Sequence, residues 1–338
     1  MTKENGFTVR DIENIFQLKE KINSRQTLLN MEERKEIPQA KRVARGKLEQ
    51  RVWSLSDLVE IGSKLSYLEK PKRQEILVVN ISKGGTSKSF TTLSLSRLLA
   101  LSGIKTLVIG LDIQKSFTKY VQQEQEIEDI SDIKSEDLGL YHLLFEGATL
   151  EEVIKPSDIP TLHYIPETNE LNLLNKRLNL ETRKEYLFKD KLLPKLKDYQ
   201  VIIFDTAPSF SSLIENAMVA STVLISPISC DVGCYQVLQD YITITEEFFE
   251  TMRIAPEHYL MPTLLDKNKI SQQIYGAYLN QYSDKVIPIG VKRAVIAQEA
   301  SVLRKSIFEY DPTSSLATDL AESFKEIWKR IIKSEVNN

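Results

Sequence analysis

The chain has 338 residues, of which 42% are apolar and 27% are charged, and this excludes an intrinsically disordered protein because such chains bury too little apolar surface. The formal net charge of −3 excludes a uniformly basic surface, so any contact with DNA must come from a local patch. No apolar run approaches the roughly 18 residues of a membrane span, and the polar N-terminus has no signal-peptide core, so we expect a cytoplasmic protein. The two cysteines, Cys230 and Cys234, provide no disulfide framework, and we expect reduced thiols.

The N-terminal region is mildly basic, with 16 Lys and Arg against 12 Asp and Glu in residues 1–75. Most of the excess lies in RKEIPQAKRVARGKLEQR, residues 34–51, where Pro38 interrupts an otherwise helix-compatible stretch. A solvated charged face and a DNA-binding patch are both open interpretations of this run. The next segment, SLSDLVEIGSKL, has a capping serine, Ser54 or Ser56, before helically spaced apolar residues. It predicts a helix in which Gly62 permits a turn, which could be half of a helix-turn-helix, although no recognition helix is visible.

From residue 75 onward, short apolar segments alternate with amphipathic segments. This pattern predicts a doubly wound α/β fold, in which a mostly parallel sheet carries helices on both faces. The polar, acidic and glycine-free residues 122–136 predict an exposed loop. The change of pattern divides the chain into a helical N-terminal extension, residues 1–72, and a larger domain, residues 73–338. We expect strands at residues 75–81, 105–112, 162–166, 199–205, 221–227, 259–265 and 285–289.

The first of these strands runs into NISKGGTSKS, residues 80–89, and a helical segment follows. A glycine loop between a strand and a helix lets backbone N–H groups converge on phosphate oxygens, and the helix N-terminus adds partial positive charge. Lys88 stands where a loop lysine reaches the β- and γ-phosphates, and Ser89 stands where a hydroxyl coordinates Mg²⁺. A plain glycine turn is the alternative, but the two lysines and the hydroxyl favour a phosphate site.

The strict pattern GxxxxGK[ST] fails at both glycine positions, which are Ser82 and Ser87. The residues that remain, with Lys83 ahead of Gly84 and Gly85, resemble the deviant Walker A loop of the ParA/MinD class of P-loop ATPases. The resemblance implies that Lys83 reaches across a dimer interface to the nucleotide of the partner subunit. If Ser87 must adopt the positive φ of a glycine, the strain is about 1–3 kcal/mol and would slow turnover without abolishing binding.

Two later segments extend the resemblance. TLVIGLDIQ is similar to the second family motif, DxDxQ, which implies that Asp112 positions or activates the attacking water, with Gln114 as the motif's Gln. Gly110 replaces the first Asp of that motif and predicts one fewer carboxylate near the metal. YQVIIFDTAPS resembles a Walker B strand, in which Asp205 holds a metal-bound water. A helix cap or a turn would explain each segment alone, but the three motifs follow three strands in the family's order.

The resemblance covers nearly all of residues 75–330 and, with the N-terminal extension, points to the larger partition ATPases. It implies ATP and Mg²⁺ as cofactors, slow hydrolysis of ATP to ADP and phosphate, and an ATP-dependent homodimer that binds nonspecific DNA on the nucleoid. It also implies a ParB-type centromere-binding partner that stimulates hydrolysis. The implied catalytic residues are Lys83, Lys88 and Asp112, and the implied metal ligands are Ser89 and Asp205. The implied nucleotide-binding residues are Lys83, Gly84, Gly85, Thr86, Ser87, Lys88, Ser89 and Phe90.

A second basic segment is IGVKRAVIAQEAS, in which Arg293 matches a basic residue that family members use for nonspecific DNA binding, with Lys292 beside it. Ordinary solvated surface explains both residues equally well. The apolar stripe of the C-terminal LAESFKEIWKRIIK suits a MinD-like membrane-cycling ATPase, but packing on the sheet explains the same stripe, and we expect no membrane partner.

Two further alternatives remain open. An iron–sulfur reductase with the same loop would carry its cysteines on separate loops, whereas Cys230 and Cys234 stand within one turn. The other alternative is a DNA-binding repressor whose degenerate loop only senses nucleotide, which the substitutions at Ser87 and Gly110 keep open.

Overall fold

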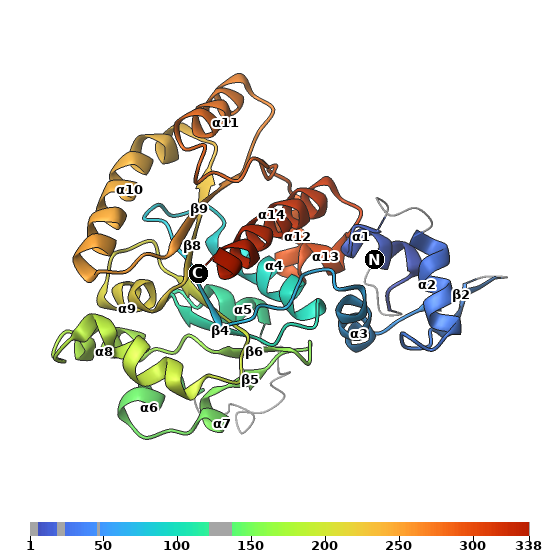
Figure 1. The fold of residues 1–338 in the computed structure, drawn as a ribbon, viewed down its shortest axis with the longest axis horizontal. Helices are drawn as coiled ribbons and strands as arrows, with labels where there is room; N and C mark the ends of the chain where they lie inside the picture. The colour runs from blue at the N-terminus through green and yellow to red at the C-terminus, as the bar shows by residue number, and fades with distance from the viewer. Residues whose placement is uncertain (1–5, 19–23, 46–47, 122–136, 338) are drawn as a thin grey trace.

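The computed structural model describes residues 6–18, 24–45, 48–121 and 137–337, so the loop predicted at 122–136 lies outside the described residues. The centre of the molecule is a seven-stranded sheet in the order β5-β6-β4-β7-β3-β8-β9 (Figure 1). Its neighbours are parallel except for β5 with β6 at one edge. The strands are β3 (Glu75–Val79), β4 (Thr106–Leu111), β5 (Lys155–Pro156), β6 (Leu162–Ile165), β7 (Val201–Thr206), β8 (Val223–Ser229) and β9 (Glu257–Thr263). The predicted α/β class is confirmed.

Helices cover both faces of the sheet, because alternate residues of a buried strand point to opposite sides. In β3, Leu77 and Val79 belong to one core, and Ile76 and Val78 belong to the other. The first core includes α4 (Lys88–Leu101), α5 (Ser116–Val121), α12 (Ile296–Val302), α13 (Ile307–Tyr310) and α14 (Ser315–Asn337). The second includes α6 (Leu140–Phe145), α7 (Leu150–Val153), α8 (Leu171–Leu178), η4 (Phe188–Leu192), η5 (Leu193–Lys195) and α9 (Ser212–Ala220). The short helix η3 (Lys184–Tyr186) precedes η4 and has no buried residue. A third lies between α10 (Val232–Met252) and α11 (Lys269–Gln281).

Six of the seven predicted strands are present, and the segment at residues 285–289 is the exception. There the chain runs beside β9 and makes an isolated bridge between Leu260 and Val286. Pro288 has no backbone N–H, so it cannot donate to β9 at this position, and the pairing stays short. β5 was not predicted, because two residues are too few to form a recognisable apolar pattern.

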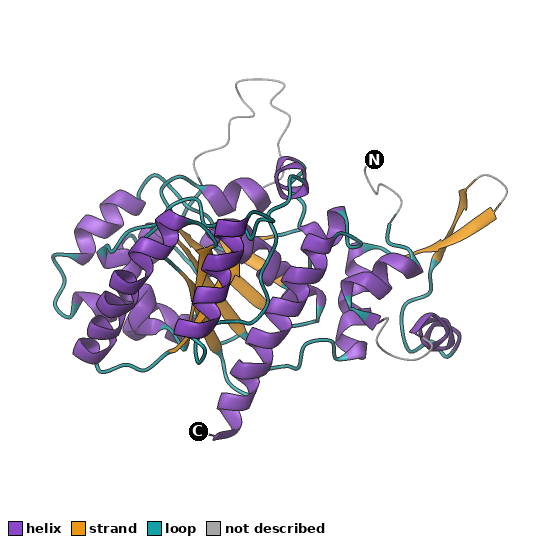
Figure 2. Ribbon diagram, turned by 90° about the horizontal axis from the view of Figure 1, so that it is seen from above, coloured by secondary structure: helices purple, strands orange, loops and turns teal. Residues whose placement is uncertain are grey.

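The N-terminal extension is only partly helical. It contains α1 (Val9–Ile15), α2 (Ser24–Glu33) and α3 (Leu55–Leu65), but residues 34–51 contribute most of an antiparallel hairpin of β1 (Lys41–Arg45) and β2 (Leu48–Val52). The prediction of a helix-compatible stretch was therefore wrong here, because cross-strand pairing is a contact that the local helical pattern does not contain. Figure 2 shows the hairpin extending away from the body of the molecule.

The helix predicted after the hairpin is confirmed as α3. Ser54 caps it by accepting from the Asp57 N–H at 3.2 Å. Gly62, however, does not turn the chain, because the helix continues to Leu65. A Cβ at Gly62 would lie 2.1 Å from the Leu101 carbonyl oxygen, so this glycine allows α3 to pack closely against the end of α4.

The apolar stripe of the C-terminal helix faces the core. Trp328 is buried, and its Nε1 donates to the Glu69 carbonyl oxygen at 2.8 Å, which ties α14 to the segment that precedes β3. The stripe is therefore used in packing, and this removes the basis of the membrane-cycling alternative. Among the residues that the structure describes, no helix is long and apolar enough to cross a membrane. The buried stripe residues are Leu320, Phe324, Ile327, Trp328 and Ile331.

Candidate nucleotide-binding site

The loop between β3 and α4 has the backbone of a phosphate-binding loop. Gly85 has a φ of 74°, and Ser87 has a φ of 71° with a ψ of 26°, so both lie in the left-handed region. A Cβ added to Gly84 or Gly85 would meet nothing within 4 Å, which leaves open space beside the backbone N–H groups. This space fits a phosphate chain held by main-chain donors at the start of α4. Phe90 packs its ring against the core, so any contact it makes with nucleotide must come from its backbone.

Side chains from neighbouring elements hold the loop in place. Asn80 Nδ2 donates to Thr206 Oγ1 at 2.7 Å, and Tyr241 OH donates to the Asn80 carbonyl oxygen at 3.0 Å. Thr263 Oγ1 donates to the carbonyl oxygen of the buried Thr86 at 3.2 Å. These supports were not predicted from the sequence, because their partners lie more than 100 residues from the loop in the chain.

The two loop lysines point in different directions. Lys88 is buried under the loop, and its Nζ donates to the Lys83 carbonyl oxygen at 3.0 Å. Burial lowers the pKa of Lys88, and the charges of Asp205 and Asp112 oppose that shift. Lys83 instead extends to Asp231, with 2.5 Å between Nζ and Oδ1. Asp231 was missed by the sequence analysis, although its place directly after β8, at the same sheet edge as the loop, was an available signal.

The oxygens of Ser89 and Asp205 lie together at the end of β7. Ser89 Oγ donates to Asp205 Oδ2 at 2.7 Å, and Thr92 Oγ1 donates to Asp205 Oδ1 at 2.7 Å. Thr92 was not predicted, but it lies three residues after Ser89 and thus on the same helix face. Asp205 is fully buried, and burial together with the charge of Glu167 raises its pKa to about 7.

This oxygen-only set fits Mg²⁺, which prefers oxygen ligands and retains water molecules. In the described part of the chain, no group of three or more His, Cys, Asp or Glu could hold a metal ion. Ser89 and Asp205 would therefore share the ion with phosphate oxygens and water.

β4 brings the second motif to the same edge. Gly110 pairs in register with Asp205 of β7, and Asp112 lies beyond the strand, where its Oδ1 accepts from the Gln114 N–H at 2.9 Å. Gly110 brings no carboxylate to this edge, but the buried side chain of Glu167 fills the space beside it. Glu167 was not predicted as a site residue, because it follows β6 and lies 57 positions from Gly110 in the chain.

The cysteines behave as ordinary buried thiols. Burial raises the pKa of both groups, and that of Cys230 reaches about 12. Because the thiolate is the form that binds metal, this environment disfavours the iron–sulfur alternative.

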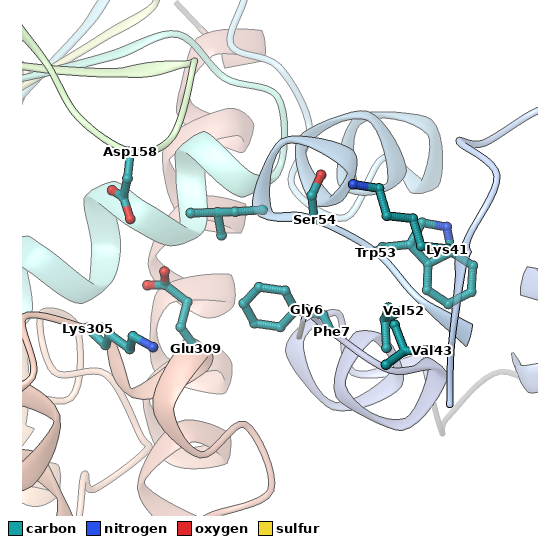
Figure 3. Close-up of a pocket in the computed structure, with 11 residues that line it drawn as sticks. Gly6, Phe7, Lys41, Val43, Val52, Trp53, Ser54, Asp158, Lys305 and Glu309 are labelled. Atoms are coloured by element: carbon teal, nitrogen blue, oxygen red, sulfur yellow. The ribbon is translucent and has the colours of Figure 1, made fainter. Parts of the chain in front are cut away.

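A separate cavity of about 510 Å³ lies between the N-terminal extension and the body of the molecule (Figure 3). Trp53 and Lys41 lie on its extension side, and Asp158, Lys305 and Glu309 lie on its other side. No residue of the phosphate loop lines it, so it is not the nucleotide site.

The two candidate DNA-binding residues have different surroundings. Lys292 is partly exposed, and its Nζ pairs with Asp319 at 3.0 and 3.2 Å. Arg293 is exposed, and its backbone N–H donates to the Leu265 carbonyl oxygen at 2.9 Å. The Lys292 ammonium is thus partly neutralised, which makes Arg293 the stronger candidate of the two.

Comparison with known proteins agrees with this geometry. The sequence profile of the AAA domain family matches residues 74–257, just over half of the chain. The chain is 26% identical over 262 residues to the sporulation initiation inhibitor protein Soj of Bacillus subtilis, which covers 75% of this chain and 98% of that protein. The chain belongs to the ParA/Soj family of partition ATPases. Because the match begins at residue 74, the N-terminal helices and hairpin form an extension ahead of the ParA/Soj domain.

Two solved structures share the fold. A putative plasmid partition protein from Borrelia burgdorferi bound to AMPPNP has a TM-score of 0.61 at 20% identity, over 76% of this chain and all of that one. A cobyrinic acid a,c-diamide synthase from Mycobacterium smegmatis, with a bound ATP analogue and magnesium, has a TM-score of 0.58 at 17% identity, over 77% of this chain and 95% of that one. Structural relatives thus bind ATP analogues and Mg²⁺, and ParA/Soj membership implies ATPase activity.

Proposed function

We propose that this ParA/Soj protein is a DNA segregation ATPase that binds ATP with Mg²⁺, dimerises in response, and hydrolyses ATP slowly. The observation that carries the proposal is the convergence of three motifs at one sheet edge. The phosphate loop, Asp112 and Asp205 lie at the ends of β3, β4 and β7, which are neighbours in the sheet. Phosphoryl transfer depends mainly on positioning and on charge neutralisation, so these groups suffice for a slow reaction.

The position of each residue supports a distinct task. The loop N–H groups and Lys88 would hold the phosphates, and Ser89 with Asp205 would hold the magnesium ion. When bound, that ion neutralises charge on the phosphates. Asp112, just beyond β4, would orient the attacking water. Lys83 has a side chain that is 27% exposed, so it can leave Asp231 and turn toward a second subunit.

Exposed apolar side chains around the site support dimerisation across this edge. Ile113 follows β4, Phe210 follows β7 and Val232 follows β8, and their exposed fractions are 47%, 37% and 48%. Apolar groups that gather on one surface favour a protein partner. A second copy of the chain would cover them and bring the Lys83 side chains toward the facing nucleotides.

For DNA we propose two contacts on a chain whose overall charge is negative. Arg293 would bind DNA without sequence preference, and the hairpin of the extension, with its exposed Lys41 and Arg42, would supply a second contact. A projecting two-stranded ribbon is a shape that can enter a DNA groove. A ParB-type partner would stimulate hydrolysis and release, and the ATP-bound dimer would be found on the nucleoid in the cytoplasm.

The test measures ATPase rate and oligomer mass with ATP and Mg²⁺, with and without nonspecific DNA. We expect weak, DNA-stimulated turnover in the wild type, which Lys83→Ala and Asp112→Ala abolish. The dimer should persist in Asp112→Ala and change in Lys83→Ala. Lys189→Ala, an exposed lysine far from the loop in sequence, is the matched control and should behave as wild type.

One result would contradict the enzymatic proposal. If the wild type binds ATP and dimerises but never hydrolyses ATP, the substitutions at Ser87 and Gly110 have produced a nucleotide-sensing DNA-binding protein instead.

A further inference from the structure

The buried carboxylate of Glu167 lies beside Gly110, where the ParA/Soj motif carries an aspartate. A Cβ built on Gly110 would be 2.3 Å from Glu167 Cγ, 2.4 Å from Cδ and 2.9 Å from Oε1. Real Cβ atoms essentially never come this close to another atom, so an aspartate at this position would force the Glu167 side chain out of its observed position. The space that an aspartate would need is already occupied by a carboxylate.

Glu167 reaches this place because β6 and β4 are neighbours. Ile109 pairs with Ile165 in register, so the chain that leaves β6 passes directly beside the end of β4. Glu167 is 2% exposed, which is uncommon for a glutamate unless its charge is hydrogen-bonded. The Glu167 side chain reaches from the end of β6 to the end of β4 and places its carboxylate beside Gly110.

The hydrogen bonds of Glu167 lead to the segment that carries Asp112. Its Oε1 accepts from the Phe117 N–H at 3.2 Å, and its Oε2 accepts from the Thr118 N–H at 2.7 Å and from Thr118 Oγ1 at 2.5 Å. Thr118 Oγ1 is also placed to accept from the Glu167 N–H at 3.0 Å. These bonds fix the first turn of α5, which begins four residues after Asp112.

We propose that Glu167 is the positioning residue for Asp112 and that it replaces, from the segment after β6, the carboxylate missing at Gly110. The inference rests on the proposed role of Asp112 in orienting water for ATP hydrolysis. The hydrogen bonds of its carboxylate go to Phe117 and Thr118, so it acts by clamping the turn that follows the DIQ segment, residues 112–114. In its observed position Glu167 leaves no room for a Cβ at position 110.

The test combines Glu167→Ala, Gly110→Asp and the double variant, with steady-state ATP turnover and ATP affinity measured on the full chain. Glu167→Ala should lower kcat about 10- to 100-fold, because a small displacement of a catalytic group has that effect. Its affinity for ATP should stay within about two-fold, because the phosphate loop is untouched. Gly110→Asp alone should be impaired by the clash. The double variant should recover at least about ten-fold in kcat over Glu167→Ala, because the introduced aspartate side chain then has room.

A purely structural role would give a different pattern. It would lower stability and ATP affinity together with kcat, and the two substitutions would be additive rather than mutually rescuing. Unchanged kcat in a folded Glu167→Ala protein, or a double variant that carries the product of both defects, would overturn the inference.

Two additions keep the test decisive. If Glu167→Ala does not fold, Thr118→Val takes its place, because it removes one of the three hydrogen-bond donors to the Glu167 carboxylate with little change of volume. It should lower kcat several-fold at unchanged ATP affinity. An unchanged kcat would count against the clamp. A wild type without turnover would refute the proposed function itself, whereas wild-type turnover that Glu167→Ala leaves intact would refute only the clamp.

Discussion

Ser87→Gly should stabilise the chain although it removes atoms. Ser87 has a φ of 71°, and its side chain makes no capping hydrogen bond to α4, so the hydroxyl offers little in return for the strained backbone. An L-residue in the left-handed region costs about 1–2 kcal/mol. Glycine also makes the unfolded chain more flexible, which lowers the free energy of unfolding by about 0.4–1 kcal/mol and offsets part of the relieved strain. The difference predicts a gain of about 0.5–1 kcal/mol in the free energy of unfolding.

Thermal unfolding without nucleotide is the assay. For a domain of this size the gain corresponds to a rise in Tm of about 1–3 °C. Ser87→Ala is one control, because alanine keeps the Cβ that causes the strain and should not raise Tm. Ser66→Gly is the matched control outside the site: Ser66 ends α3 with a φ of 48°, is exposed, and should give a similar rise.

Turnover distinguishes the two stabilised variants. If strain at Ser87 slows hydrolysis, Ser87→Gly should raise kcat by up to about five-fold, the effect of about 1 kcal/mol, and Ser66→Gly should leave kcat unchanged. A Tm for Ser87→Gly equal to or below that of the wild type would refute the reasoning, because it would mean that the loop holds Ser87 at no energetic cost.

Three other predictions concern stability and DNA. His258 is buried, and burial with the charge of Lys285 lowers its pKa to about 3. Between about pH 6.5 and 3 only the unfolded state binds the proton, so the free energy of unfolding should fall on acidification by up to about 1.4 kcal/mol per pH unit. Chemical denaturation of His258→Gln at several pH values should show a smaller dependence of the free energy of unfolding on pH. Glu309→Gln weakens the ion pair with the buried Arg97 and should lower the free energy of unfolding, measured by chemical denaturation, by about 3 kcal/mol. Asp158 also pairs with Arg97 but has a side chain that is 40% exposed, so Asp158→Asn should lower it by under about 1 kcal/mol. Arg293→Glu should weaken binding to nonspecific DNA and reduce its salt dependence by about one phosphate contact or more, with Lys292→Glu having the smaller effect.

Residues that end a strand were the most predictable part of the site. Asp112 and Asp205 each follow an apolar run, and parallel strands present their carboxyl ends at one edge, so sequence order alone indicated that the two would lie near the phosphate loop. The positive φ of Ser87 was also foreseeable, because the family pattern places a glycine there.

The missed features depend on contacts between distant segments. The carboxylate of Glu167 could not be assigned from Gly110, because their proximity follows from the order of β6 and β4 in the sheet. The hairpin at residues 41–52 was missed for a related reason: it forms through backbone pairing of β1 with β2, while its local sequence is also compatible with a helix.

The ion pair of Lys83 bears on how ATP would control assembly. Its partner Asp231 is 41% exposed in its side chain, and pairs as exposed as this contribute only about 0–1 kcal/mol. A contact of the same ammonium with a phosphate oxygen at a closed dimer interface would be shielded from water and therefore stronger, so it would outweigh the loss of the exposed pair. The pair therefore keeps Lys83 beside the site in the single chain without preventing its transfer to a second subunit. We therefore expect nucleotide binding, and not the breaking of the ion pair, to limit dimerisation.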